Sequence, residues 1–297
     1  MDTALKETLA GWAEEYNDPK YFQEDPIIFP TRFARKHAAG EASVADVEIA
    51  ALLSSHLAWG RRSMIVRDCD RMFEEMCWRP YDYVMNREYR DEAASLHRTI
   101  KWSEFAGICG RLRGLYESRQ SLEGLTDMEI RCLIYGQKED KKAPNKKISM
   151  MKRWLVRDDG KVDLGVWKAS DKKKLILPLD VHVYAQASTL GLTSRRQKDI
   201  VTAQEITDAF KEIWPEDPCK GDFALFGYGV THQYKPKLKL CQDYTSYQAA
   251  TAPARPPRPT PCFRKCWNAA NSSTRTSSQK DCRRLNLKEH RFRQDAI

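Results

Sequence analysis

Apolar residues recur at helical spacing through most of residues 1–240, and this periodicity is the strongest constraint on the fold. Residues 44–76 predict two helices joined by a turn at Gly60. Further helices are predicted over 102–118, 126–135, 146–157, 181–190 and 203–214. Sustained alternation of apolar and polar residues between hairpin turns is scarce. The pattern therefore predicts an all-α protein.

The composition indicates a globular body followed by a segment of different character. With 297 residues, of which 41% are hydrophobic, the chain can form one large domain or two modest ones. We predict a helical domain over 1–240. Beyond it, proline-rich and serine-rich stretches with an excess of arginine replace the apolar periodicity. We therefore expect 241–297 to be a basic disordered tail.

The sequence favours a cytoplasmic protein. Its N-terminal residues contain no long apolar run, and the longest apolar runs elsewhere are too short to cross a bilayer. The nine cysteines lack the spacing of a disulfide framework. Cys262 and Cys266 lie close together, but no second pair completes a metal site. We expect a monomer with reduced thiols, no bound metal and no membrane partner.

The formal net charge of +9 is concentrated in two places. Lysine and arginine exceed aspartate and glutamate in 138–174 and again in 241–297, whereas 1–137 carries an excess of acidic residues. Local basic segments favour a polyanionic partner that docks at defined places. Lysine clusters in loops are also commonly just solvated, so the charge pattern does not by itself identify the partner.

A single aspartate stands at the start of a predicted helix in the stretch LILPLDVHVYAQASTLGL, residues 175–192. Pro178 disfavours helix in the residue before it, and Asp180 can accept hydrogen bonds from N–H groups of the next turn. The positive end of the helix dipole also favours a carboxylate at this position. Capping alone explains such a residue, and a catalytic role is compatible with capping.

Three blocks of sequence share their order and spacing with a group of DNA-repair enzymes. They are IAALLSSHLAWG at 49–60, LPLDVHVY at 177–184 and DFALFGYGV at 222–230. Together they resemble the helix-hairpin-helix DNA glycosylase superfamily, which includes endonuclease III and the archaeal 8-oxoguanine glycosylases, and more closely an uncharacterised bacterial family related to it. The resemblance implies two helical lobes around a central cleft, approximately 46–174 and 1–45 with 175–240. The LPGxG hairpin of the superfamily is missing, which implies a degenerate helix-hairpin-helix.

The resemblance also assigns roles to individual residues. Asp180 takes the position of the catalytic carboxylate. Lys146, at the start of KKISMMKRWLVR, takes the position of the nucleophilic lysine, while helical geometry places Lys147 on the apolar side and keeps it as a competitor. His56 falls where the superfamily has a glutamine that fills the gap left by an extruded base, although a histidine packed at a helix end is equally expected. The residues expected to contact DNA are His56, Lys152, Arg153, Arg157 and His182.

The implied function is excision of a damaged base from double-stranded DNA, with or without strand-nicking lyase activity through a lysine Schiff base. A lysine nucleophile needs a lowered pKa, which burial and neighbouring cations can provide. The alternatives are a non-catalytic DNA-binding protein of the same fold and a helical protein-interaction scaffold. Phe226 and Gly227 are expected to serve packing. No cofactor is expected, because the four-cysteine array of an iron–sulfur cluster and metal-ligand histidine motifs are missing.

Overall fold

The computed structural model of the protein describes residues 1–232, so the predicted tail at 241–297 lies outside the described residues. The described chain is mostly helical, which confirms the all-α prediction, and its only strands within 1–232 are one short pair. In chain order the helices are α1 Thr3–Tyr16, α2 Ile28–Ala38, α3 Val44–Leu57, α4 Arg62–Glu75, α5 Pro80–Asn86, α6 Trp102–Tyr116, α7 Asp127–Glu129, α8 Lys146–Val156, α9 Val181–Thr189, α10 Ile200–Phe210 and α11 Gly221–Thr231. The shorter elements are the antiparallel strands β1 Ser95–His97 and β2 Ile100–Lys101, the 3₁₀ turns η1 Pro19–Phe22, η3 Lys172–Lys174 and η4 Pro218–Lys220, and the π-helical turn η2 Ile130–Ile134.

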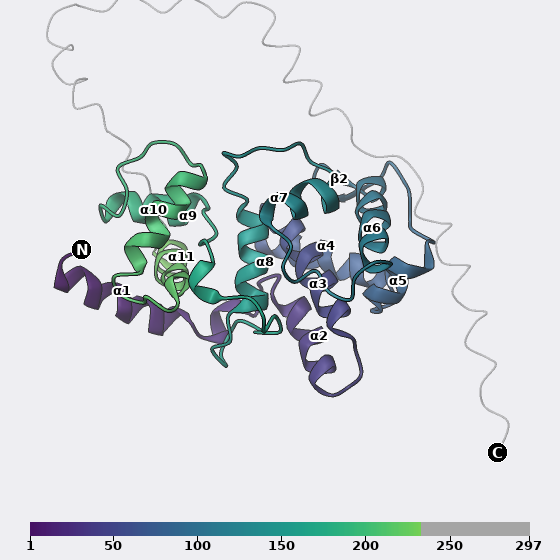
Figure 1. Ribbon diagram of the computed structural model, residues 1–297, viewed down its shortest axis with the longest axis horizontal. Helices are drawn as coiled ribbons and strands as arrows, with labels where there is room; N and C mark the ends of the chain where they lie inside the picture. Colours follow the sequence, from purple (N-terminus) through teal and green to yellow (C-terminus); the bar gives the residue numbers. More distant parts are fainter. Residues whose placement is uncertain (233–297) are drawn as a thin grey trace, which may run out of the picture. The chain divides into compact units, whose positions relative to one another are not determined.

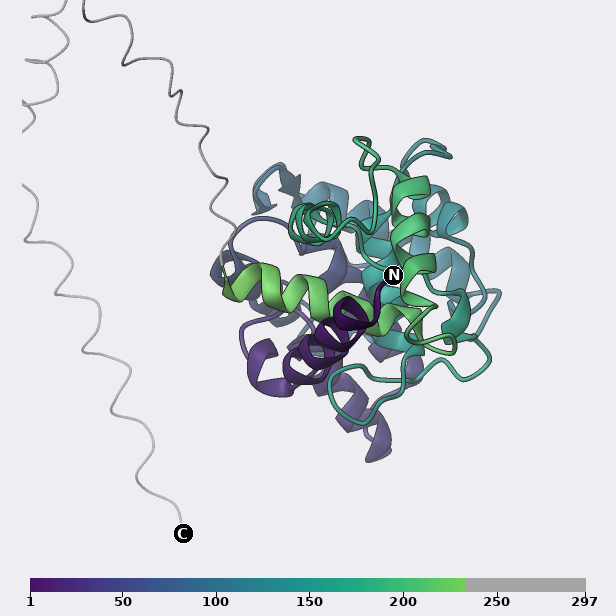
Figure 2. The same cartoon turned by 90° about the vertical axis from the view of Figure 1, so that its left-hand side faces the viewer.

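The helices form two groups, which lie side by side in Figure 1. The terminal group contains α1, α9, α10 and α11, in which α1 and α9 both pack on α11. Figure 2 shows α1 lying alongside α11. The central group contains α2 to α8, with α2 and α8 packed on α3. Helix α2 lies in the 1–45 segment that was expected to accompany the terminal group, and it packs on α3 of the central group.

The core of the central group is built around α3. Every residue of this helix from 47 to 57 is buried, and a capping box between Ser43 and Asp46 begins it. The one buried carboxylate on the helix, Glu48, accepts hydrogen bonds from the Tyr116 hydroxyl at 2.8 Å and the Trp167 indole N–H at 2.6 Å. A helix that is buried on all sides is held in a fixed position, so the loop that follows it is fixed as well.

Most predicted helix boundaries agree with the structure. The pair predicted over 44–76 is confirmed as α3 and α4, and Gly60 between them has a φ of +107°, which favours glycine. The predictions for α8 and α9 are correct to within one residue. Helix α10 begins at Ile200, earlier than predicted, because the Asp199 side chain caps it. The β1–β2 hairpin escapes sequence prediction, since strands this short show no alternation.

None of the helices in residues 1–232 is long and apolar enough to cross a membrane. The same residues contain no group of three or more His, Cys, Asp or Glu side chains placed to hold a metal ion.

Candidate functional site

A cavity of about 590 Å³ lies where the terminal and central groups meet. Its walls come from the loop after α3, from α4 and α8 on one side, and from α9 and α11 on the other. They combine aromatic side chains such as Trp59 and Phe226 with charged ones such as Lys146 and Asp180. The volume is in the range of pockets that bind small molecules, and charged groups converging on an aromatic cavity make it the candidate functional site.

Asp180 caps α9 from the wall of this cavity, as the sequence predicted. Its Oδ1 accepts hydrogen bonds from the backbone N–H groups of His182 and Val183, both at 2.9 Å. Its Oδ2 lies 3.9 Å from Nζ of Lys146. The side chain is 13% exposed. One carboxylate oxygen is therefore committed to the helix, while the other faces a lysine.

Lys146 is the first residue of α8 and reaches the same cavity from the central group. Its Nζ contacts Asp180 Oδ2 at 3.9 Å and the carbonyl oxygen of Ala58 at 3.5 Å. Asn145 before it has a φ of +46°, a left-handed conformation that asparagine tolerates better than most residues. The side chain is 31% exposed. The amine therefore stands between two acceptors and keeps access to solvent.

Lys147 points elsewhere. It is half-buried and does not line the cavity, and its Nζ lies 5.8 Å from the centre of the Trp59 ring. Burial, with a smaller contribution from the charge of Lys146, lowers the pKa of Lys147 to about 8. The helical wheel correctly places Lys147 on the apolar side of α8. Of the two lysines, Lys146 is the one that meets Asp180.

Arg153 and Arg157, on the same helix, are buried in ion pairs. Arg157 is 1% exposed and pairs with Asp163 and with Asp217, the latter at 2.8 Å. Arg153 is 4% exposed and pairs with Asp222 and, at 3.3 Å, with Asp163. Arg153 lines the cavity and Arg157 does not, but both guanidinium groups are already neutralised by carboxylates of the protein, which argues against the expected DNA contacts.

Lys152 and the two histidines differ in their access to the cavity. Lys152 pairs with Asp127 at 2.5 Å and does not line the cavity. His56 is 7% exposed, and its ring lies 4.4 Å from that of Tyr135. Burial lowers the pKa of His56 to about 3, so it is neutral. The expectation that His56 contacts DNA is wrong, because it is packed inside the central group. His182 lines the cavity, so its DNA contact stays a prediction.

Two further carboxylates line the cavity and were not singled out from the sequence. Asp222, at the start of α11, pairs with Arg153, and burial raises its pKa to about 6. Asp25 precedes α2, and loss of solvent raises its pKa. Asp222 begins the block DFALFGYGV, so the resemblance already pointed to the segment that contains this cavity residue. Nothing in the sequence around Asp25 marks it.

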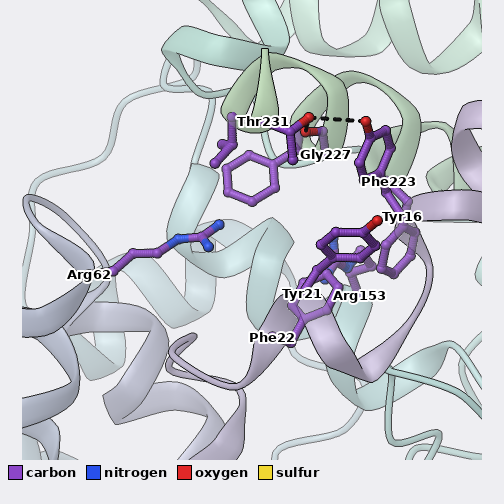
Figure 3. Close-up of a pocket in the computed structure, with 10 residues that line it drawn as sticks. Tyr16, Tyr21, Phe22, Arg62, Arg153, Phe223, Gly227 and Thr231 are labelled. Atoms are coloured by element: carbon purple, nitrogen blue, oxygen red, sulfur yellow. Dashed lines mark hydrogen bonds between the residues drawn. The ribbon is translucent and has the colours of Figure 1, made fainter. Parts of the chain in front are cut away.

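Figure 3 shows a smaller pocket of about 40 Å³, with Arg62 and Arg153 among its lining residues. It shares these two residues and Phe226 with the larger cavity. The guanidinium of Arg62 lies 5.3 Å from the Phe226 ring centre. Phe226 therefore forms part of the site, which corrects the expectation that it serves only packing. Gly227 does serve packing, because a Cβ atom there would fall 2.2 Å from Cγ of Tyr16.

Comparison with known proteins gives a family for the chain and no assigned activity. No protein of curated function matches the sequence significantly. No solved structure matches it significantly either. One family model matches in two overlapping parts, residues 25–130 and 127–231, which together include Lys146, Asp180 and Asp222. The chain belongs to the family described as "Protein of unknown function (DUF2400)".

Proposed function

We propose that the protein is a DNA glycosylase with associated lyase activity, in which Lys146 is the nucleophile and Asp180 the carboxylate that assists it. The observation that carries this proposal is the approach of Lys146 Nζ to within 3.9 Å of Asp180 Oδ2 at the wall of a 590 Å³ cavity. The two residues come from helices in different groups and are the pair that the resemblance to helix-hairpin-helix glycosylases singles out.

The geometry suits attack on a sugar carbon. The Lys146 ammonium must lose a proton before it can attack, and Asp180 Oδ2 is the carboxylate oxygen that faces it. The amine nitrogen then forms a bond to the anomeric carbon while the bond between that carbon and the base breaks, and the base leaves with the electron pair. The departing base takes a proton from the attached amine, and the proton held by Asp180 passes to the ring oxygen O4′ as the C1′–O4′ bond breaks, which leaves a Schiff base between Lys146 and C1′. Loss of a proton from C2′ then eliminates the 3′ phosphate, which nicks the strand.

The substrate must enter as an extruded nucleotide. Chemistry on a base in duplex DNA requires the nucleotide to leave the stack, at a cost of a few kcal/mol. The cavity offers aromatic surface from Trp59 and Phe226 to replace part of the lost stacking. Asp222 and His182 add polar groups to the same walls. These features support a nucleotide-sized ligand without identifying which lesion is preferred.

The test is borohydride trapping on duplex DNA that carries an abasic site. The wild-type protein is expected to give a covalent adduct, and Lys146→Gln is expected to lose it. At saturating DNA, Lys147→Gln is the matched control for the covalent step, because it removes the adjacent lysine, which does not meet Asp180. Base release is measured in parallel on duplexes with a panel of lesions, including 8-oxoguanine.

The outcomes separate the three functional classes. Salt-dependent DNA binding with neither adduct nor base release would replace the proposal with a non-catalytic DNA-binding role. Absence of salt-dependent DNA affinity would favour a protein-interaction scaffold. An adduct that persists in Lys146→Gln and disappears in Lys147→Gln would move the nucleophile to the neighbouring residue.

A further inference from the structure

Trp59 is fixed in place beside the cavity. Its carbonyl oxygen accepts a hydrogen bond from Nε2 of His97 at 2.9 Å, and Nδ1 of His97 lies 2.7 Å from Oδ2 of Asp68. His97 and Asp68 are both buried, so this connection is shielded from water. The β1–β2 hairpin is thereby tied to α4 and to the loop that lines the cavity.

The turn of the same hairpin brings a cation onto Trp59. Arg98 follows His97 directly and has a φ of +54°, an uncommon conformation for a residue with a side chain. Its guanidinium carbon lies 4.3 Å from the Trp59 ring centre. Gly60 makes room for it, because a Cβ atom on Gly60 would fall 2.7 Å from Nη1 of Arg98. The position of this arginine is therefore specified by the turn, the glycine and the indole.

Lys147 approaches the same ring from α8. Its Nζ lies 5.8 Å from the Trp59 ring centre. Within residues 1–232, neither Lys147 nor Arg98 lies within 4.0 Å of a carboxylate oxygen. Lys146, one residue earlier, faces the carboxylate of Asp180 instead. The indole N–H of Trp59 also has no acceptor among the described residues. Arg98 and Lys147 thus lie on Trp59, a wall residue of the cavity, without lining the cavity themselves, and their positive charges have no carboxylate partner among the described residues.

We infer that Arg98 and Lys147, arranged on Trp59, bind a phosphodiester group of the strand whose nucleotide enters the cavity. The inference rests on the proposed function, because a nucleotide in the cavity beside Lys146 and Asp180 carries a phosphate on either side. An arginine in a fixed orientation can donate two hydrogen bonds to one phosphate, and a half-buried ammonium without a carboxylate gains most from an anion. Lys147 is accordingly a substrate-binding residue, and Lys146 the nucleophile.

Binding to a duplex with a tetrahydrofuran abasic analogue tests the site without any covalent step. Dissociation constants are measured by fluorescence anisotropy over a series of salt concentrations. Each phosphate contact contributes about 0.9 to the slope of log affinity against log salt. Arg98→Ala and Lys147→Met are each expected to lower the magnitude of the slope by about one and to weaken binding roughly tenfold. Arg98→Lys is expected to recover most of the slope, since it keeps the charge.

Lys101→Ala is the matched control, because Lys101 lies exposed on the same hairpin and makes no contact with Trp59. Unchanged slopes in both Arg98→Ala and Lys147→Met would overturn the inference. An equal decrease in Lys101→Ala would also overturn it, because it would indicate a diffuse basic surface.

Trapping at saturating abasic DNA separates this inference from the proposed function. Arg98→Ala and Lys147→Met are expected to retain the wild-type rate of adduct formation once DNA is saturating, with a raised half-saturating concentration. Adduct formation with unchanged salt slopes would leave the proposed function standing and remove the phosphate site. Changed salt slopes without any adduct in the wild-type protein would leave the phosphate site standing and remove the proposed lyase activity.

Discussion

The two ends of α8 carry similar sequence and face different surroundings. At its C-terminal end, Arg153 and Arg157 are buried and paired with Asp163, Asp217 and Asp222. At its N-terminal end, Lys146 faces the single carboxylate of Asp180, and Lys147 has no carboxylate within reach in the described chain. A run of basic residues therefore predicts a polyanion-binding surface only where the protein supplies too few carboxylates of its own.

The two ends of α8 also differ in the direction in which the pKa of a basic residue is shifted. Burial opposes the charge of Arg157, yet hydrogen bonds and charges from Asp217 and Asp163 outweigh it and raise its pKa. Burial also opposes the charge of Lys147, but no carboxylate compensates, and its pKa falls to about 8. The arginine at the C-terminal end of α8 therefore stays charged within its ion pairs. At the N-terminal end, the charge of Lys147 has no such partner among the described residues.

Removing the carboxylate shared by the two arginines is expected to have the largest effect. Asp163→Ala leaves Arg153 and Arg157 short of a buried partner and should lower the free energy of unfolding by about 3–5 kcal/mol. Urea denaturation measures this loss. Asp158→Ala is the control, because its pair with Lys168 is exposed and should contribute less than about 1 kcal/mol. Equal losses in the two variants would show that the buried ion pairs of Arg153 and Arg157 stabilise the protein no more than an exposed pair does.

Removing Lys147, the cation without a carboxylate partner in the described chain, should raise the free energy of unfolding instead of lowering it. The pKa of Lys147 lies near 8 in the folded protein and near its ordinary value of 10.5 in the unfolded chain. The unfolded chain therefore binds the proton more tightly, and the cost to the folded state is fully present below pH 8 and fades as the pH rises toward 10.5. Lys147→Met should raise the free energy of unfolding at pH 7 by on the order of 1–3 kcal/mol, allowing for partial exposure.

The pH dependence of that gain distinguishes it from simple repacking. Chemical denaturation at pH 7 and pH 10 should show most of the gain at pH 7 only. Lys141→Met, at an exposed position of the preceding loop, should show no comparable gain at either pH. A stabilising effect combined with weaker DNA binding would mark Lys147 as a residue kept for function at a cost to stability.

Asp180 allows its structural and chemical roles to be separated. Asp180→Ala removes the cap of α9 and should destabilise the protein by about 1 kcal/mol, whereas Asp180→Asn keeps an oxygen able to cap and should remain close to wild type. Both variants should lose most of the adduct formed on abasic DNA, because neither carries a carboxylate toward Lys146. Full trapping by Asp180→Asn would show that Asp180 serves only as the cap of α9.

The smallest effect is expected at Lys152, in the middle of α8. Its pair with Asp127 is partly exposed, so Lys152→Ala should change the free energy of unfolding by less than about 1 kcal/mol. The salt dependence of DNA binding should be unchanged, because this lysine already has a carboxylate partner. A decrease in slope as large as that of Lys147→Met would show that a carboxylate neighbour does not prevent phosphate binding, and would break the comparison.

Local signals in the sequence were sufficient for the helices and for the cap. Helical periodicity placed α3, α4, α8 and α9 correctly, because these elements are specified by residues three and four positions apart. Pro178 and Asp180 marked the start of α9 through interactions within one turn. The approach of Lys146 to Asp180 was anticipated only through the resemblance to glycosylases, because two residues that far apart in the chain leave no local signal.

The partners of the charged residues could not be predicted from the sequence. Arg157 meets Asp217 across sixty positions of chain, as the contact at 2.8 Å shows. For His56, near the end of α3, the sequence left open a DNA contact or a packed position, and Tyr135 covers it from a different part of the chain. Nothing in the sequence around Trp59 marks it as a site residue, and its contacts with His97 and Arg98 of the hairpin become visible only in the fold. Such contacts depend on tertiary packing.

The pairing of α1 with α11 has a consequence for the order in which the protein is assembled during synthesis. Tyr16 on α1 packs against Gly227, and its hydroxyl oxygen is 3.0 Å from Oγ1 of Thr231, which lies 215 positions later in the chain. Helices α2 to α8 are contiguous in sequence and can pack as soon as they leave the ribosome. The helix that precedes them must wait for α11. Among the described residues, the cavity with Lys146 and Asp180 is therefore completed last, so a nascent chain exposes no assembled site until α11 has been made.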